Sequence, residues 1–222
     1  MNLDPLPFMV SLRLGLWVTT LLTLACFPLS WIFCEARGRW AIWAESLTSL
    51  PLVLSPTVLG FYLLLALSPR APIGLFFESI FHVRLAFSFA GIVIGGCVSS
   101  LPFMLTALKT AMRGVPVNLL EASYTLGKGR IETALRVLVP NMKTGLVAGI
   151  ITTFAHSIGE FGVILMIGGS VPGLTKTVSI AVYERAESLD FSGANSYAIA
   201  LVIASYIGIL FLNGLQRREA RR

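Results

Sequence analysis

The sequence predicts an all-α integral membrane protein, a bundle of about five membrane-spanning helices. Composition is the first reason: 55% of the 222 residues are hydrophobic and 13% are charged, whereas soluble domains average about half apolar and about a quarter charged. The second reason is that the apolar residues gather in five runs, and a spanning helix needs about 20 mostly apolar residues. We expect a single transmembrane domain over residues 1–222, with spans at about 10–33, 47–67, 85–108, 140–167 and 197–215.

The links between these runs predict which side of the membrane each one faces. Lys and Arg favour cytoplasmic loops. The third link carries Lys109, Arg113, Lys128, Arg130 and Arg136, and the tail carries Arg217, Arg218, Arg221 and Arg222. Five spans place these two segments on one side, which predicts an outside N-terminus, a cytoplasmic C-terminus and external second and fourth links. The first link carries Arg37 and Arg39, and the second carries Arg70 and Arg84. Because the two links have the same number of basic residues, the first adds little evidence on the orientation.

The start of the chain and its net charge narrow the class of protein further. Residues 1–5 lack the basic start and the small-residue cleavage site of a secretory signal, so we expect the first apolar run to remain as a helix. The net charge is +6, and the charged residues lie between the apolar runs. This pattern indicates basic juxtamembrane loops and no nucleic-acid partner. The three cysteines form no Cys-x-x-Cys pair, so we expect them to pack as small apolar residues.

Two of the predicted spans contain residues that are unusual inside a helix or at a helix contact. Pro51 and Pro56 interrupt the start of the second span, and the backbone groups that they free need partners in neighbouring helices or in a water-lined cavity. The third span holds the small residues 95–100, which permit close helix approach. Packing is the favoured interpretation of these small residues, and lining of a pore is the alternative.

The third link is predicted to contain two short helices. Asn118 and Glu121 have the spacing of a capping box, and Gly127 stands where a helix-ending residue with positive φ is expected. A helix of about two turns is unstable alone in water, so it needs a partner surface. A second short helix is expected over 130–139, with Pro140 in the first turn of the next span.

The same link resembles a known family motif. Glu121-Ala122-Ser123, then Gly127, then Val137-x-Val139-Pro140 is similar to the EAA motif of bacterial ABC-type import permeases, with Ser for the second Ala and Val for Ile and Leu. The resemblance implies the type I permease fold and a cytoplasmic coupling loop, 118–140, that inserts into a cleft on an ATPase subunit. The implied coupling residues are Asn118, Leu119, Glu121, Ala122, Ser123, Gly127 and Pro140. An ordinary amphipathic loop helix is the alternative.

Three further stretches, 50–60, 154–162 and 171–177, resemble the molybdate branch of these permeases. Sulfate and thiosulfate permeases share a Gly-Glu-Tyr-Gly version of the second stretch, so an oxyanion is the firmer expectation, and tungstate stays open beside molybdate and sulfate. The resemblance implies a homodimer in the cell inner membrane, in contact with lipid, two ATP-binding cassette subunits and an external or periplasmic oxyanion-binding protein.

No catalytic, metal or cofactor site is expected in this chain. It has two histidines, His82 and His156, and no His, Cys and carboxylate cluster with ligand spacing. It also lacks a Gly-x-x-x-x-Gly-Lys-Ser/Thr loop. ATP and Mg would therefore be bound by the partner ATPase.

His156 and Glu160 are four residues apart and share a helix face. An ionisable residue inside a span is a functional hypothesis by default, but a carboxylate repels an anion. The favoured role for Glu160 is a brace or gate, with direct substrate contact and a plain external position as alternatives. The candidate pathway or gate residues are Ser99, Ser100, Thr153, His156, Ser157, Gly159, Glu160 and Gly162. For the hydroxyl groups of these serines and of Thr153, and for that of Thr152, interhelical packing is the stronger interpretation. Lining of the substrate path is the weaker one.

The rival from another class is a self-contained membrane protein, either an ion-coupled transporter or an intramembrane enzyme that uses His156 and Glu160. Such transporters are often built from repeats with paired broken helices, and the sequence shows no repeat. The purified chain distinguishes the two, since a coupled transporter moves its substrate without ATP or partners.

Overall fold

The computed structural model describes residues 4–35 and 39–219, and every regular element within them is a helix. Three helices are long and apolar enough to cross a membrane, and two bent pairs raise that number to five. The three are α1 (Leu6–Glu35), α5 (Phe89–Arg113) and α12 (Phe191–Glu219). The predicted all-α membrane bundle is confirmed. Arg37, Arg221 and Arg222 lie outside the described residues.

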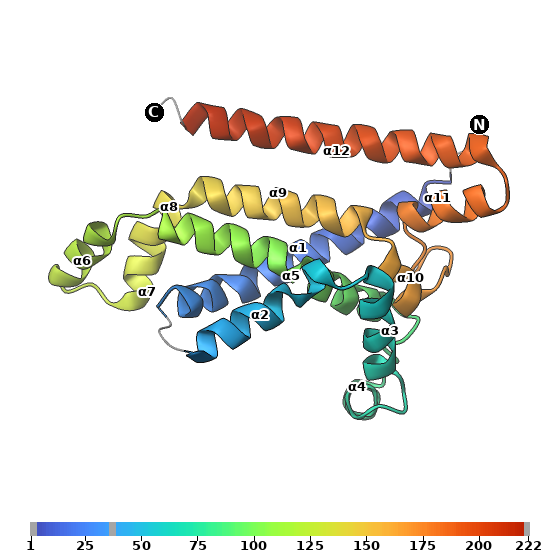
Figure 1. Ribbon diagram of the computed structural model, residues 1–222, viewed down its shortest axis with the longest axis horizontal. Coiled ribbons are helices and arrows are strands. Elements are labelled where there is room, and N and C mark those ends of the chain that lie inside the picture. The colour runs from blue at the N-terminus through green and yellow to red at the C-terminus, as the bar shows by residue number, and fades with distance from the viewer. Residues whose placement is uncertain (1–3, 36–38, 220–222) are drawn as a thin grey trace.

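Figure 1 shows how the helices divide between the two ends of the bundle. The third link, with α6 (Val117–Thr125) and α7 (Arg130–Thr133), protrudes at one end. The other end holds α3 (Pro56–Leu67), α4 (Pro72–Phe81), α10 (Gly162–Gly168) and α11 (Val178–Glu187). Helix α1 begins at this second end, and α12 ends at the end of the protruding link. The start of α1 and the finish of α12 therefore lie on opposite sides of the bundle.

The second predicted span, 47–67, is divided between two helices. The predicted interruption is confirmed before Pro56 and is wrong at Pro51, which lies inside the first of these helices. The chain instead forms α2 (Arg39–Val53) and α3 (Pro56–Leu67), bent by 115°. Ser55 has φ −58° and ψ 134°, as expected because a residue before proline is pushed out of the helical region. Helix α2 is about 22 Å long, less than the thickness of about 30 Å of a bilayer core.

The fourth predicted span, 140–167, is also divided. It is preceded by α7, a π-helical turn over Ala134–Leu138 and α8 (Val139–Asn141). A bend of 77° then separates this segment from α9 (Lys143–Gly159). Glu160 is extended and ends α9, and α10 (Gly162–Gly168) is a separate helix. Pro140 therefore lies before the bend, and its predicted place in the first turn of the long helix is wrong.

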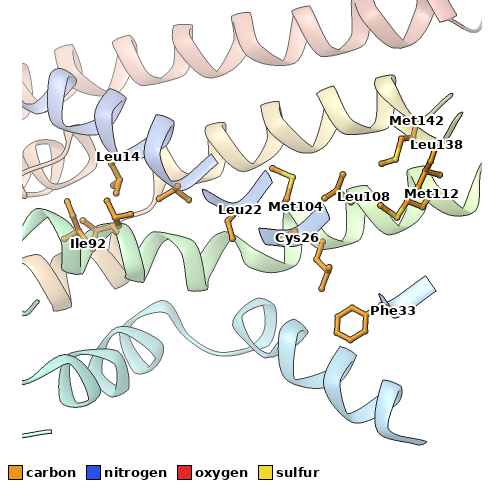
Figure 2. Packing of buried hydrophobic residues seen from close by; sticks show 14 of the residues in the cluster. Leu14, Leu22, Cys26, Phe33, Ile92, Met104, Leu108, Met112, Leu138 and Met142 are labelled. Carbon is orange, nitrogen blue, oxygen red and sulfur yellow. The ribbon is translucent and has the colours of Figure 1, made fainter. Parts of the chain in front are cut away.

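The main core lies between α1 and α5. Figure 2 shows Leu14, Leu22 and Cys26 of α1 among buried residues of α5 such as Met104 and Leu108. Cys26 is completely buried among them, in agreement with its expected packing role. Close van der Waals packing holds the two helices together, because lipid tails are as apolar as these side chains and supply no hydrophobic driving force.

Helices α5 and α9 approach each other closely along a stripe of small residues. A Cβ atom on Gly145 would lie 2.3 Å from Cβ of Ala111, and one on Gly149 would lie 3.0 Å from Cβ of Ala107. Two glycines four residues apart, as here, let the backbones of neighbouring membrane helices approach closely. Because the stripe lies at the end of α9 nearest the protruding link, it joins that link firmly to the end of α5.

Candidate functional site

The first short helix of the protruding link ends at Gly127, as the sequence predicts. Gly127 has φ +77°, and its N–H donates to the carbonyl of Tyr124 at 2.9 Å. The N–H of Lys128 donates to the carbonyl of Ser123 at 3.2 Å. These two bonds form a Schellman motif, in which the left-handed position favours glycine.

The predicted capping box at the start of this helix is wrong. Helix α6 begins at Val117 with Pro116 as its N-cap, and no side chain caps it. Asn118 consequently lies inside the first turn, where its side chain cannot act as the cap. Both Asn118 and Glu121 are exposed. Their polar groups are thus available to a partner.

Ser123 has a different place from the other predicted coupling residues. Its hydroxyl lies 2.8 Å from the hydroxyl of Thr133, and both side chains are buried. The bond ties α6 to α7 from within. Leu120, on the same side of α6, packs against the main core. Ser123 therefore braces the link internally and does not belong to its outer face.

The outer face of the link is apolar and exposed. The exposed residues among those predicted to couple are Asn118, Leu119, Glu121, Ala122, Gly127 and Pro140. The structure adds Ile131 and Leu135, which are 79% and 62% exposed. Sequence reasoning missed these two because residues 131, 134, 135 and 138 have the spacing i, i+3, i+4, i+7 that predicts a single buried face. The π-helical turn over Ala134–Leu138 changes that register. An apolar face on a protruding link marks an interaction site. We name Leu119, Leu126, Ile131 and Leu135 the coupling face.

Charged side chains reinforce the second half of the link. Glu132 lies 2.9 Å from Nζ of Lys128 and 3.2 Å from the guanidinium of Arg136. The hydrogen bond from Lys128, together with the positive charges of both partners, lowers the pKa of the Glu132 carboxyl. Such exposed pairs add little stability, and both lie within the second half of the link itself.

A small polar pocket of about 210 Å³ lies where the bend between α2 and α3 meets α5, the end of α9 and the start of α10. It is lined by the α2–α3 bend and by Ser99, Phe103, His156, Glu160 and Val163. Nε2 of His156 lies 3.6 Å from the Glu160 carboxylate, and the other carboxylate oxygen accepts the N–H of Val163 at 3.2 Å. Glu160 thus connects the end of α9 to the start of α10.

Both helix breaks meet at this pocket. A Cβ atom on Gly162 would lie 2.7 Å from Cβ of Pro56, so the start of α10 touches the start of α3. Gly159, in contrast, has no atom within 4 Å of an added Cβ. Of these two candidate gate glycines, Gly162 is the one that the packing requires.

The predicted pathway hydroxyls divide into two groups. Ser99 lines the pocket with His156 and Glu160. Ser100 bonds to Nδ1 of His156 at 3.0 Å and to the hydroxyl of Ser157 at 3.1 Å. Ser100, Ser157 and Thr153 are buried between α5 and α9. Interhelical packing therefore accounts for these three hydroxyls. The predicted pathway residues that line the pocket are Ser99, His156 and Glu160.

No metal site accompanies these features. Within the residues that the structure describes, no three His, Cys, Asp or Glu side chains are grouped so as to hold a metal ion.

The sequence matches known proteins along most of its length. Residues 27–222 match the family model for the binding-protein-dependent transport system inner membrane component. The molybdenum transport system permease protein ModB of Azotobacter vinelandii is 36% identical over 211 residues, covering 95% of this chain and 93% of that protein. ModB of Escherichia coli (strain K12) is 31% identical, covering 100% and 93%. The sulfate transport system permease protein CysT of Salmonella typhimurium is 27% identical, covering 87% and 70%.

Solved structures share the fold at low sequence identity. A bacterial ABC transporter involved in alginate import superposes with a TM-score of 0.72 at 16% identity, covering 96% of this chain and 79% of that one. The MetNI methionine ABC transporter gives 0.68 at 16% identity, covering 95% and 93%. Both likenesses concern the fold alone. Together with the family match, they show that the chain belongs to the binding-protein-dependent transport system inner membrane components, as a multi-pass, non-catalytic permease subunit with the type I ABC importer fold.

Proposed function

We propose that this chain is the permease of a molybdate importer. The observation that carries the proposal is the 36% identity to ModB, which extends over 95% of this chain. The similarity to CysT is lower and covers 70% of that protein, so sulfate is the second candidate. Selection among oxyanions is expected to reside mainly in the external binding protein.

The proposed assembly contains two copies of this chain, two ATPase subunits that bind ATP and Mg, and an external binding protein. The protruding link faces the cytoplasm in this arrangement, so the N-terminus is outside and the C-terminus is cytoplasmic. The coupling face supports the docking of the ATPase, because its exposed apolar side chains need a partner surface in water.

Transport follows by alternating access. Closure of the ATPase subunits on ATP draws the two protruding links together. The close contact of Gly145 with Ala111 makes α9 and α5 follow as one body. The pocket between the two helix breaks is the proposed gate, with Glu160 as its brace rather than as a ligand, since a carboxylate repels a molybdate dianion. ATP hydrolysis then restores the inward-facing state.

Uptake into proteoliposomes that contain the assembled complex tests the substrate. Labelled molybdate is offered with equal concentrations of unlabelled tungstate or sulfate. We expect molybdate to enter in an ATP-dependent manner and sulfate to compete poorly. Preferential import of sulfate would reject molybdate as the substrate while leaving the permease assignment intact.

A charge reversal at the coupling loop tests the docking site. Glu121→Arg is expected to leave membrane insertion intact and to abolish co-purification with the ATPase. Glu187→Arg is the matched control, because Glu187 is equally exposed but lies on α11 at the opposite end of the bundle. If Glu121→Arg assembles and transports as well as Glu187→Arg, the loop does not dock the ATPase.

A further inference from the structure

Helix α2 is attached to the rest of the chain by a face of small and polar residues. It packs mainly on α5. The side chains toward α5 are small or polar: Ala41 is buried, and Ala44, Glu45 and Thr48 are half-buried. Its opposite side is exposed and apolar, with Trp43 at 77% exposure. Few apolar contacts therefore bind α2 to α5, and a specific polar contact has more influence on its position.

An ion pair provides that contact. Nζ of Lys109 on α5 lies 2.7 Å from the Glu45 carboxylate on α2. The Lys109 side chain is 16% exposed, and its charge lies 5.7 Å from the centre of the Phe33 ring, a residue that Figure 2 places at the α2 side of the core cluster. The Glu45 side chain is 35% exposed, so solvent screens this pair less than a fully exposed pair but still reaches it.

Lys109 belongs to the part of α5 that moves with the protruding link. It lies between Ala107 and Ala111, the residues in close contact with Gly149 and Gly145 of α9. The protruding link connects the ends of these same two helices, since α5 ends at Arg113 and α9 begins just after the link. A displacement of the link therefore carries Lys109 with it.

The other end of α2 leads into the polar pocket. Helix α2 ends at Val53, and the bend that follows lines the pocket with Leu54 and Pro56. Helix α3 beyond the bend is held against α10 by the Gly162–Pro56 contact and by Gly60, whose added Cβ would lie 2.7 Å from Cβ of Met166. Helix α3 is thus fixed, and α2 is the part that can tilt about the bend.

We propose that Glu45 and Lys109 are positioning residues that make α2 follow α5, so that movement of the protruding link reaches the polar pocket. The inference rests on the proposed function only in that an ATPase moves the link. Neither residue contacts the substrate in this role. Loss of either charge is expected to weaken the connection between ATP hydrolysis and uptake while ATP hydrolysis itself continues.

A double-mutant cycle in the assembled complex, reconstituted in proteoliposomes, tests the proposal. The variants are Glu45→Gln, Lys109→Met and the exchanged pair Glu45→Lys with Lys109→Glu. Removing one partner leaves the other charge uncompensated, so each single variant is expected to lower uptake per ATP hydrolysed about tenfold. The exchanged pair restores the attraction and is expected to recover uptake to within about threefold of the unaltered complex.

Two readouts separate positioning from a merely structural role. Co-purification with the ATPase and the basal ATPase rate should both stay within about twofold of the unaltered complex, since the pair lies outside the coupling face. The matched control exchanges Lys176 and Glu184, an ion pair at the opposite end of the bundle, and should leave uptake per ATP unchanged.

Single variants with unaltered uptake per ATP would overturn the proposal, and so would an exchanged pair as poor as the single variants. Loss of ATPase co-purification in Glu45→Gln and Lys109→Met alike would also overturn it, because the pair would then be needed for assembly. The ratio is measured with whichever oxyanion the unaltered complex imports. A complex that imports sulfate instead of molybdate would reject the proposed substrate and leave this test readable.

Discussion

His156 and Glu160 lie on one face of α9 with 3.6 Å between Nε2 and the carboxylate, at the point where the helix ends. The second carboxylate oxygen accepts the N–H of Val163, so the side chain also caps the start of α10. Nδ1 of His156 contacts Ser100 of α5. Three helices therefore meet through two ionisable side chains beside the polar pocket.

Replacement of Glu160 separates its hydrogen-bonding role from its charge. Glu160→Gln keeps an acceptor for the Val163 N–H, whereas Glu160→Ala leaves that group and His156 without it. We expect Glu160→Ala to lower the free energy of unfolding by about 1–3 kcal/mol and Glu160→Gln to have the smaller effect. Thermal unfolding of the detergent-solubilised chain measures both. Equal stability of the two variants would contradict the capping role.

The contact between Gly162 and Pro56 predicts a second effect on stability. Gly162→Ala places a Cβ atom 2.7 Å from Cβ of Pro56, so α3 and α10 must move apart, at an expected cost of about 1–3 kcal/mol. Gly159→Ala is the matched control, because an added Cβ there has no neighbour within 4 Å. Thermal unfolding should place Gly159→Ala close to the unaltered chain, and a similar loss in both variants would show that packing is not the cause.

The buried bond between Ser123 and Thr133 predicts non-additive mutations. Ser123→Ala leaves the Thr133 hydroxyl buried without this partner, at a cost of about 1–3 kcal/mol. Replacing both residues, with Ser123→Ala and Thr133→Val, removes both hydroxyls and should cost less than the sum of the single changes. Protection of α6 amides from hydrogen exchange reports the local stability. Strict additivity would mean that the two hydroxyls do not depend on each other.

Features that depend on local sequence were predictable. The apolar runs gave the membrane class because about 20 apolar residues in a helix suffice to cross a bilayer, and the helix end at Gly127 followed from the conformational freedom of glycine. The pairing of His156 with Glu160 was also accessible, since a spacing of four residues places two side chains on one helix face.

Features that depend on tertiary contacts could not be predicted from the sequence. One local feature also failed, since the capping box at Asn118 is wrong because Pro116 starts the helix two residues earlier. The inward position of Ser123 depends on Thr133, a residue of another helix. The polar pocket needs the breaks in two distant spans to meet, and the close contact of Gly162 with Pro56 that joins them cannot be read from either segment alone.

The left-handed residue of the protruding link gives a final prediction. Gly127 has φ +77°, and an added Cβ would meet no atom within 4 Å, so substitution there acts through the backbone alone. A side chain in the left-handed region costs about 1–2 kcal/mol, and a β-branched one is particularly unfavourable. Gly127→Val should therefore disturb the end of α6 and weaken co-purification with the ATPase.

Gly129→Val is the control for this change. Gly129 also has open space around an added Cβ, but its φ of −72° and ψ of 166° suit any residue. Both variants add the same side chain to the same exposed turn, and only Gly127→Val adds left-handed strain. Gly129 is the N-cap of α7, so Gly129→Val carries its own smaller cost at that cap. Weaker ATPase binding in Gly127→Val alone would show that the geometry of the turn sets the coupling face, whereas equal weakening in both would assign the effect to bulk at the interface.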